Sequence, residues 1–341
     1  MNDIDAHLHD WPAWPVYGLI DDLLPVLERW HQDDETVAIA TLVDIVGSSP
    51  RPLGSEMAVT ASGRVAGYVS GGCVEGAVAA QALAVLASGR PRLLDYGAGS
   101  PVLDVQLTCG GRIGILVRAI PDLAVHLQRR RAARNNRQAL LLDIDMASGA
   151  EQPVPDRNAP ASFAAGFRQS YLPPARLMAI GGDPVTLAVC ELAPLFGFEV
   201  GLIRPYGPSA APPGSQLAYY DTRPLLRALP DLPLDAWSAL YTLTHDIDDD
   251  HAALAHGLSS PAFRVGALGS QSKTTQRLAY LRAAGFDEQA LARLDTPAGL
   301  DIGARNPREI ALSVIAGATA ARPASPRACQ LAGAQILPPA D

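Results

Sequence analysis

The chain has 341 residues, which exceeds what one hydrophobic core usually supports, so we expect two domains. Hydrophobic residues make up 48% of the chain and charged residues 18%, which is typical of globular proteins with well-filled cores. The formal net charge of -8 argues against nucleic acid as a partner, and no apolar run reaches the ~18 residues that stable membrane insertion needs.

The N-terminus and the cysteines indicate a cytoplasmic protein. The first fifteen residues are acidic and broken by prolines, without the basic and apolar regions of a signal peptide. The four cysteines form no CxxC pair and are too few for a disulfide scaffold; they are Cys73, Cys109, Cys190 and Cys329. Cys190 lies among apolar residues at helical spacing and is predicted to be core, whereas Cys329 near the C-terminus needs no role.

The first half of the chain predicts a mixed α/β domain over residues 15–165. Its first elements, in chain order, are a helix at 18–30 with an internal Pro25, a strand at 36–47, a turn at 47–54, a hairpin about Ser62-Gly63 and a helix from Cys73 to Ser88 that ends at Gly89. Strand patterns follow at 92–97, 102–111 and 112–120, then a helix at 121–134 and a strand at 139–145. These elements favour an antiparallel or mixed sheet.

The second half predicts a Rossmann-like domain over residues 170–320, after a Pro- and Ala-rich segment at 153–162 and a boundary near 165–175. Strands are expected at 176–180, 198–203, 239–245 and 263–269, with helices such as 184–196 between them. This alternation predicts a doubly wound parallel sheet. A last helix follows Asn306 as N-cap, with Pro307 at its first position and Glu309 completing a capping box. Residues 321–341 are expected to form a flexible tail.

Gly71, Gly72 and Cys73 lie where a predicted strand ends and an alanine-rich helix begins. Glycines in such a turn let the backbone approach a ligand and leave helix N–H groups directed outward. A cysteine in the first turn of a helix favours the thiolate form, which can bind a soft metal, carry sulfur or act as a nucleophile. The alternative is a small side chain packed beside a tight turn. The turn alone leaves both interpretations open.

Two other stretches of the first half carry candidate residues. Cys109 precedes Gly110 and Gly111 and so repeats part of the first turn, although packing alone is the simpler interpretation for it. Arg51 stands between two prolines, where a stiffened turn would present its guanidinium to a phosphate or carboxylate. The arginine run at 129–137 predicts a solvated helix face rather than an anion site.

The glycine turn of the second domain departs from the dinucleotide-binding fingerprint. Counted from Gly181, the second and third glycine positions hold Asp183 and Thr186. An aspartate there opposes a pyrophosphate, and Pro184 lacks an N–H donor. The next strand ends in Arg204 rather than in an acid, so we expect ordinary NAD binding to be absent, while Arg204 leaves room for a phosphorylated ligand.

Two further strands of the second domain end in polar residues. His245 closes the segment 239–245; Gly269 closes the segment 263–269, and Ser270 follows it. Ligands of open α/β sheets bind at the carboxyl ends of the strands. Together with Gly181 and Gly182, these residues predict a pocket at that edge. A purely structural hydrogen bond is the alternative for His245.

These motifs together resemble the XdhC/CoxI family, the accessory proteins that mature xanthine dehydrogenase and carbon monoxide dehydrogenase. The likeness is carried by GSSPRPLGSEMAVTASGRVAGYVSGGCVEGAV and by LTCGGRIGILV, which fits the family's second Cys-Gly-Gly element. In the second half it is carried by TLTHD, GALGS and GLDIGARNPREIALSVIAGATA, which resemble the family's Rossmann-like domain. The resemblance covers most of residues 35–120 and 172–320.

The resemblance implies a chaperone for the molybdenum cofactor in its molybdopterin form, without turnover of its own. Such a protein holds the cofactor while a cysteine desulfurase exchanges an oxo for a sulfido ligand, and then passes it to an apo molybdenum hydroxylase. Carried over residue by residue, the resemblance assigns cofactor binding to Gly71, Gly72, Cys73, Glu75 and Cys109, with Cys73 as the contact to molybdenum. A thiolate is a fitting soft ligand for that metal.

Where this sequence departs from the family, nucleotide binding by the second domain is in doubt. The family's Gly-Ala-Gly-His turn is replaced by Gly181-Gly182-Asp183-Pro184, and its Asp-Pro-Arg segment by Arg204-Pro205-Tyr206. An NAD(P)-dependent oxidoreductase is the competing hypothesis, against which the broken fingerprint counts. A nucleotide-sensing or scaffold module is a third. We also expect a homodimer, and the sequence does not name the client hydroxylase.

Overall fold

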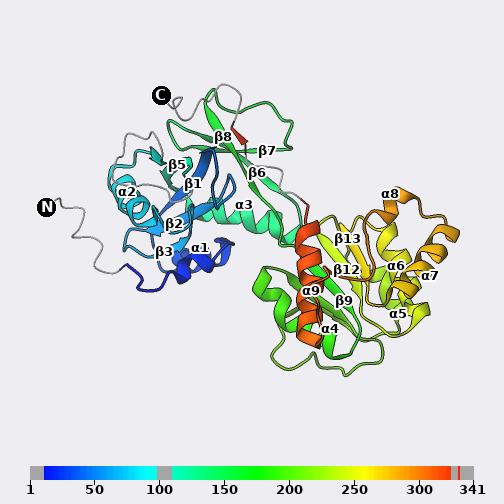
Figure 1. Cartoon of the computed structure of the whole chain (residues 1–341). Coiled ribbons are helices and arrows are strands. Elements are labelled where there is room, and N and C mark those ends of the chain that lie inside the picture. Colours follow the sequence, from blue (N-terminus) through cyan, green and yellow to red (C-terminus); the bar gives the residue numbers. More distant parts are fainter. Residues whose placement is uncertain (1–10, 98–109, 324–328, 331–341) are drawn as a thin grey trace. The chain divides into compact units, whose positions relative to one another are not determined.

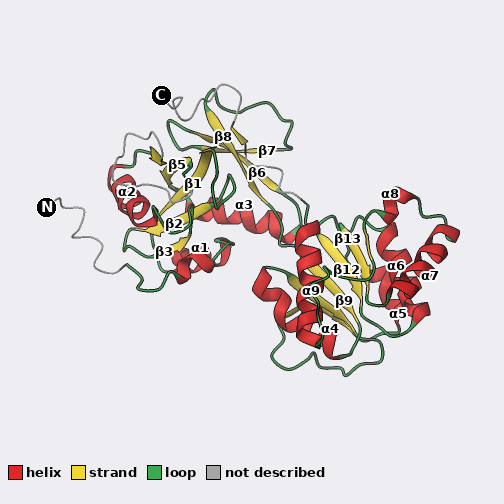
Figure 2. Cartoon of the chain, viewed as in Figure 1, coloured by secondary structure: helices red, strands yellow, loops and turns green. Residues whose placement is uncertain are grey.

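The computed structural model describes residues 11–97, 110–323 and 329–330, which form two compact units (Figure 1). Within these residues, the N-terminal unit runs to Leu172 and includes Cys329–Gln330, and the C-terminal unit begins at Pro173. Both units combine helices with sheets, as Figure 2 shows. No helix in the described part of the chain is long and apolar enough to span a membrane.

A five-stranded antiparallel sheet forms the centre of the N-terminal unit. Its order is β3-β2-β1-β5-β4, and its strands are β1 (Val37–Val46), β2 (Glu56–Thr60), β3 (Val65–Gly67), β4 (Arg92–Gly97) and β5 (Arg112–Ala119). The hairpin predicted from the sequence is the β2–β3 pair. The predicted strand at 102–111 falls largely outside the described residues.

Both faces of this sheet are covered by helices. Along β1, Ala38, Ala40 and Leu42 pack with α2 (Glu75–Ser88), while Val37 and Ile39 pack with α1 (Leu24–Gln32) and α3 (Leu123–Asn135). This alternation follows from the two-residue period of a strand.

The helix predicted at 18–30 begins later than expected. A short 3-10 helix, η2 (Val16–Leu19), comes first, and α1 starts at Leu24 with Pro25 in its first turn. The prediction of an internal proline is therefore wrong. The physical reason is that the first turn needs no N–H from Pro25, whereas a helix interior would.

A second, four-stranded antiparallel sheet completes the N-terminal unit. Its order is β15-β8-β6-β7, with β6 (Leu140–Asp145), β7 (Glu151–Val154), β8 (Gly166–Tyr171) and β15 (Cys329–Gln330). The sequence did not predict β7 and β8, because the Pro- and Ala-rich segment between them reads as a linker. Pairing of Cys329–Gln330 with β8 contradicts a loose tail at those two residues; residues 324–328 and 331–341 lie outside the described part.

The C-terminal unit is the predicted Rossmann-like domain, with a parallel sheet in the order β11-β10-β9-β12-β13-β14. Its strands are β9 (Arg176–Ile180), β10 (Glu199–Ile203), β11 (Leu217–Asp221), β12 (Ser238–Thr242), β13 (Arg264–Ala267) and β14 (Leu294–Asp295). The chain builds outward from β9 to β11 and then returns to place β12 on the other side of β9. The ends of β9 and β12 therefore form the point where the strand order reverses.

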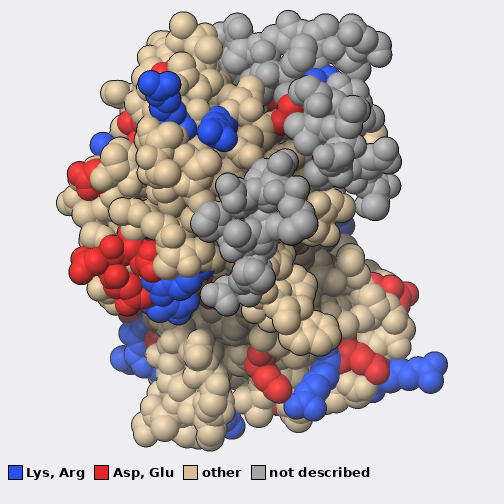
Figure 3. Space-filling view, turned by 90° about the vertical axis from the view of Figure 1, so that its left-hand side faces the viewer, with Lys and Arg blue, Asp and Glu red and all other residues tan. Residues whose placement is uncertain are grey.

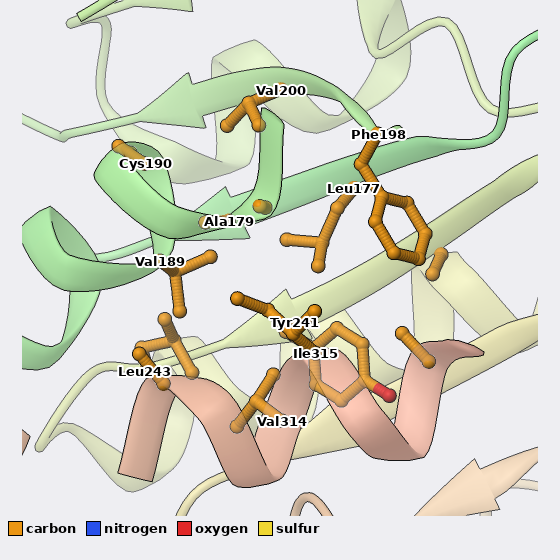
Figure 4. Close-up of a cluster of buried hydrophobic side chains, with 14 of the residues drawn as sticks. Leu177, Ala179, Val189, Cys190, Phe198, Val200, Tyr241, Leu243, Val314 and Ile315 are labelled. Atoms are coloured by element: carbon orange, nitrogen blue, oxygen red, sulfur yellow. The ribbon is translucent and has the colours of Figure 1, made fainter. Parts of the chain in front are cut away.

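Helices cover both faces of the parallel sheet. On one face, α4 (Pro184–Leu192) and α9 (Pro307–Ala321) pack on Leu177, Ala179 and Tyr241 in the cluster of Figure 4, which also holds the buried Cys190. On the other face, Met178 and Ile180 pack with α5 (Leu225–Ala228) and α6 (Ile247–Ser259). The remaining helical segments are α7 (Gln271–Ala283), α8 (Glu288–Leu291), η3 (Ala193–Phe196) and η4 (Leu229–Asp231).

The predicted start of the last helix is confirmed. The Asn306 side chain accepts a hydrogen bond from Glu309 N at 3.0 Å, and Pro307 occupies the first helical position. The Glu309 carboxylate reaches back to Arg305 N at 2.7 Å, one residue before the N-cap. The capping box therefore closes with a small shift in its second bond.

The arginine run on α3 is paired with acidic residues rather than simply solvated. Arg131 bonds Glu28 of α1 at 2.8 Å, Arg134 bonds Asp22 at 2.5 Å, and Arg129 bonds Glu151 of β7 at 3.2 Å. On the face drawn in Figure 3, acidic and basic side chains lie beside one another in the described surface. These ion pairs connect α3 to α1, to β7 and to the segment that precedes α1.

Glu151 is a carboxylate that joins several basic side chains of this unit. It accepts hydrogen bonds from Arg118 Nη2 at 2.9 Å and lies 3.1 Å from His126 Nδ1, and both of those side chains are buried. Burial alone would raise the pKa of Glu151, but the bonds and charges of His126 and Arg118 outweigh it and lower the pKa to about 2.

We expect the charge of Glu151 to stabilise the fold at neutral pH. Because its pKa falls from 4.5 to about 2 on folding, the charge contributes about 3 kcal/mol above pH ~4.5, and this is lost as the pH falls toward ~2. Urea unfolding of the wild type and of Glu151→Gln should therefore differ by about 3 kcal/mol at neutral pH, with the gap closing in acid.

The control for this experiment is Glu288→Gln, which removes an exposed carboxylate that bonds Arg282 at 2.9 Å. That change should cost less than about 1 kcal/mol. A wild-type to Glu151→Gln gap that stays constant down to pH ~2 would contradict the assignment.

Candidate functional site

The glycine turns of the N-terminal unit fold against one another. Gly71 packs on Pro50 of the 47–54 turn, since a Cβ at Gly71 would lie 3.4 Å from Pro50 Cγ. Gly111 lies against Ser48 of the same turn so closely that a Cβ there would be 2.0 Å from the Ser48 carbonyl oxygen. Three stretches that are far apart in the sequence thus meet at one end of the five-stranded sheet.

Cys73 is exposed in this region, but it does not lie in the first turn of the helix as predicted. The N-cap of α2 is Val74 and the helix begins at Glu75, so Cys73 precedes it. Gly72 before it has φ +100° and no atom near its missing Cβ, a conformation that suits glycine. The Cys73 N–H donates to Ser70 Oγ at 3.2 Å. The thiol is presented by a tight turn, not by the end of a helix.

Glu75 has its carboxylate directed into the protein. Its side chain belongs to a residue only 1% exposed, and it accepts hydrogen bonds from Ser70 N at 2.8 Å and Val74 N at 3.2 Å. The Ser70 hydroxyl donates to the same carboxylate at 2.8 Å. The carboxylate therefore bonds the preceding turn and the N-cap N–H of α2, and no side chain caps the first turn of that helix.

Arg51 lies beside the same turns. Its guanidinium packs over the Tyr68 ring, 4.3 Å from the ring centre, and bonds Asp21 Oδ1 at 2.8 Å. Its Nε atom is buried without a hydrogen-bond partner. Because Asp21 is largely exposed, an incoming anion could share or displace that pairing. Cys109 lies outside the described residues.

In the C-terminal unit, the predicted residues gather at the carboxyl edge of the sheet. Gly181 follows β9 and approaches the Leu243 carbonyl after β12, so that a Cβ on Gly181 would lie 3.0 Å from that oxygen. Gly182 supports the side chain of Arg204, whose Nε would be 2.8 Å from a Cβ there. The point where the strand order reverses is thus lined by Gly181, Gly182 and Arg204.

Asp183 acts as the N-cap of α4 at this point. Its Oδ1 accepts from Thr186 N at 2.8 Å and from Thr186 Oγ1 at 2.7 Å, and its Oδ2 lies 3.6 Å from Nε2 of the exposed His245. The carboxylate satisfies the helix end where a dinucleotide fold binds pyrophosphate. The geometry therefore agrees with the sequence in opposing a diphosphate at α4.

A buried ion pair holds the loops of this edge together. Arg277 and Asp250 are both inaccessible and bond directly. Thr242 at the end of β12 and Thr244 after it donate to Asp250 at 2.6 and 2.9 Å. Arg277 donates to the Leu268 carbonyl after β13 at 2.6 Å. Gly269 packs on the guanidinium itself. Sequence reasoning missed this pair, since nothing in the local pattern links positions 250 and 277.

Lys273 is a further residue that the sequence analysis passed over. It lies in the first turn of α7, next to Gly269 and Ser270, and it is the single lysine among the 27 lysines and arginines of the chain. Its being the single lysine is the sequence signal that could have identified it. Among the described residues, no group of three or more His, Cys, Asp or Glu side chains suits a metal ion.

Family comparisons agree with this architecture. Residues 177–317 match the XdhC Rossmann domain, and residues 30–97 match the XdhC and CoxI family. The chain is 32% identical over 288 residues to the molybdenum cofactor insertion chaperone PaoD of Escherichia coli, covering 83% of each chain. It is 25% identical to a probable xanthine dehydrogenase subunit of Bacillus subtilis, covering 85% of this chain and 94% of that one.

A solved structure shares the fold. The structure of a xanthine dehydrogenase from Bacillus halodurans superposes with a TM-score of 0.71 over 86% of this chain and 93% of that one, at 22% identity. This likeness supports the arrangement of the elements and nothing finer.

We expect no micromolar binding of NAD or NADP by calorimetric titration, because the Asp183 carboxylate occupies the N-terminus of α4. Asp183→Asn keeps a side chain that caps helices and removes the charge, so it should bind dinucleotides at least as well as the wild type. Micromolar affinity of the wild type for NAD would contradict this. Selective NADP binding that Arg204→Ala removes would instead make Arg204 a contact to the 2′-phosphate.

The same titration has a second readout in the single lysine. An amine-reactive reagent can modify only Lys273 and the chain's N-terminal amine, and peptide mass spectrometry separates the two. A ligand at the carboxyl edge should slow labelling of Lys273 and leave the N-terminal amine as an internal reference. Equal labelling with and without nucleotide is the expected result.

Proposed function

The chain belongs to the XdhC and CoxI family, and from that premise we propose that it holds the molybdenum cofactor for a molybdenum hydroxylase. In this proposal the chain binds the molybdopterin form as cargo. A cysteine desulfurase sulfurates the cargo while it is held, and the chain then delivers it to an apo hydroxylase of the xanthine dehydrogenase type. The chain acts in the cytoplasm as a homodimer, without turnover of its own.

The exposed Cys73 beside packed glycine turns is the observation that carries the proposal. A soft thiolate suits molybdenum, and Gly71 and Gly72 add no side chain that would shield it. Arg51, at the same end of the sheet, offers a guanidinium for the pterin's phosphate.

The carboxyl edge of the C-terminal unit is proposed as a secondary cofactor contact. Gly181, Gly182, Arg204 and His245 lie about one point of the sheet edge, and Gly269 and Ser270 follow β13 on the same edge. Their chemistry favours a single phosphate or a neutral ring over a diphosphate, because Asp183 caps α4.

An NAD(P)-dependent oxidoreductase remains the alternative. The strand order of the C-terminal unit is that of dinucleotide-binding domains, which favours it. The capped α4 and the arginine after β10 count against it.

Cys73→Ala should keep the fold and lose most of the retained cofactor, because it removes the only thiol of the described turns. The measurement is molybdenum by mass spectrometry and oxidised pterin by fluorescence, both per mole of purified protein. Cys109→Ala should lose less, since packing alone is the simpler interpretation for Cys109. Equal molybdenum and pterin in Cys73→Ala and the wild type would mean that the thiol only packs.

The chain should also be needed to activate its client. A molybdenum hydroxylase produced without this chain is expected to fold but to contain missing or desulfo cofactor. Client activity, molybdenum content and cyanide-releasable sulfur should be compared in cells with and without the gene. Equal client activity and equal metal loading in cells with and without the gene would contradict the chaperone proposal and make the oxidoreductase the favoured function.

A further inference from the structure

A buried carboxylate without a cation lies directly behind the Cys73 turn. Glu75 is 1% exposed, and none of the described arginine, lysine or histidine side chains forms an ion pair with it. Its charge is met instead by N–H and O–H donors of the turn itself, at Val69, Ser70 and Val74. Burying an ion in this way is costly unless each bond is kept, so the turn and the carboxylate fix one another.

Ser70 links that carboxylate to the cysteine. The Ser70 hydroxyl is itself buried, donates to Glu75 and accepts the N–H of Cys73 at 3.2 Å. A continuous path therefore runs from the backbone of Cys73 through Ser70 to Glu75. Gly72, between them, can take its φ of +100° only because it lacks a side chain.

We propose that Glu75 is a positioning residue: it does not touch the cofactor but, through Ser70, holds the Cys73 turn in the conformation that presents the thiol. This inference rests on the proposed function and replaces the direct cofactor contact that the family resemblance implies for Glu75. Both carboxylate oxygens already accept bonds from the turn, and the side chain has no exposed surface left for a ligand.

Two variants separate positioning from contact. Ser70→Ala breaks the path to Cys73 while leaving the Glu75 charge and its bonds to the backbone. Glu75→Gln replaces an acceptor oxygen by an NH₂ group that faces N–H donors. The matched control is Ser238→Ala in the other unit, where a buried serine likewise donates to a carboxylate, Asp235, at 2.7 Å and accepts a backbone N–H.

The first readout is hydrogen exchange of peptides spanning residues 69–76, measured on the full chain without cofactor. Exchange should be roughly tenfold faster in Ser70→Ala and faster still in Glu75→Gln, since each loses bonds that protect the turn. Exchange in β1 and β5 should be unchanged. Ser238→Ala should not alter exchange at 69–76.

The second readout is retained molybdenum and pterin in the same proteins. Retention should fall in both turn variants in proportion to the faster exchange, and Ser238→Ala should retain as much as the wild type. Lost retention with unchanged exchange would overturn the proposal and make Glu75 a direct contact. Faster exchange with full retention would overturn it too, because the order of the turn would then not matter. If the wild type itself retains no cofactor, the proposed function fails, while the exchange result still decides whether Glu75 orders the turn.

Discussion

The bonds between the Glu75 carboxylate and the backbone of the preceding turn are the interaction on which the N-terminal site depends. The buried carboxylate accepts hydrogen bonds from Ser70 N, Val74 N and the Ser70 hydroxyl, and these donors replace a cation beside it. These bonds turn the carboxylate inward, and the exposed side of the turn is left with the thiol and with glycine backbone.

In the C-terminal unit, two carboxylates cap helices directly. Asp183 caps α4 and Asp246 caps α6, so at both helix ends an internal carboxylate stands where a nucleotide phosphate would bind. The fold alone would favour a dinucleotide, since the strand order places β9 and β12 at the reversal point. The fold therefore favours dinucleotide binding, whereas the capped helix ends oppose it. The functional argument depends on the chemistry of the site.

Local patterns predicted much of the fold and less of the site. Alternation predicted β2 and β3, a β-branched apolar run predicted β1, and the Asn306–Pro307–Glu309 signature predicted α9, because those signals act within a few residues. The strands β7 and β8 were missed since Pro- and Ala-rich residues between them resemble a linker. Whether Glu75 faces a ligand or the interior depends on how the turn before it folds back, and a helix start read to within two residues cannot decide that.

The roles of the charged residues were the hardest feature to predict from the sequence, and the reason is structural. Among the described residues, the most deeply buried basic side chains are arginines paired with acids, as in Arg277 with Asp250 and Arg118 with Glu151. A guanidinium can bond both oxygens of a carboxylate and the nearby carbonyls at once, which an ammonium cannot do in the same geometry. Arginine therefore forms internal ion pairs in this chain, and a run of arginines in the sequence says little about binding partners. Lys273, the single lysine, lies at the carboxyl edge of the parallel sheet and is not explained in that way, because no buried carboxylate among the described residues pairs with it. The single lysine is therefore better evidence of a functional surface than the arginines are.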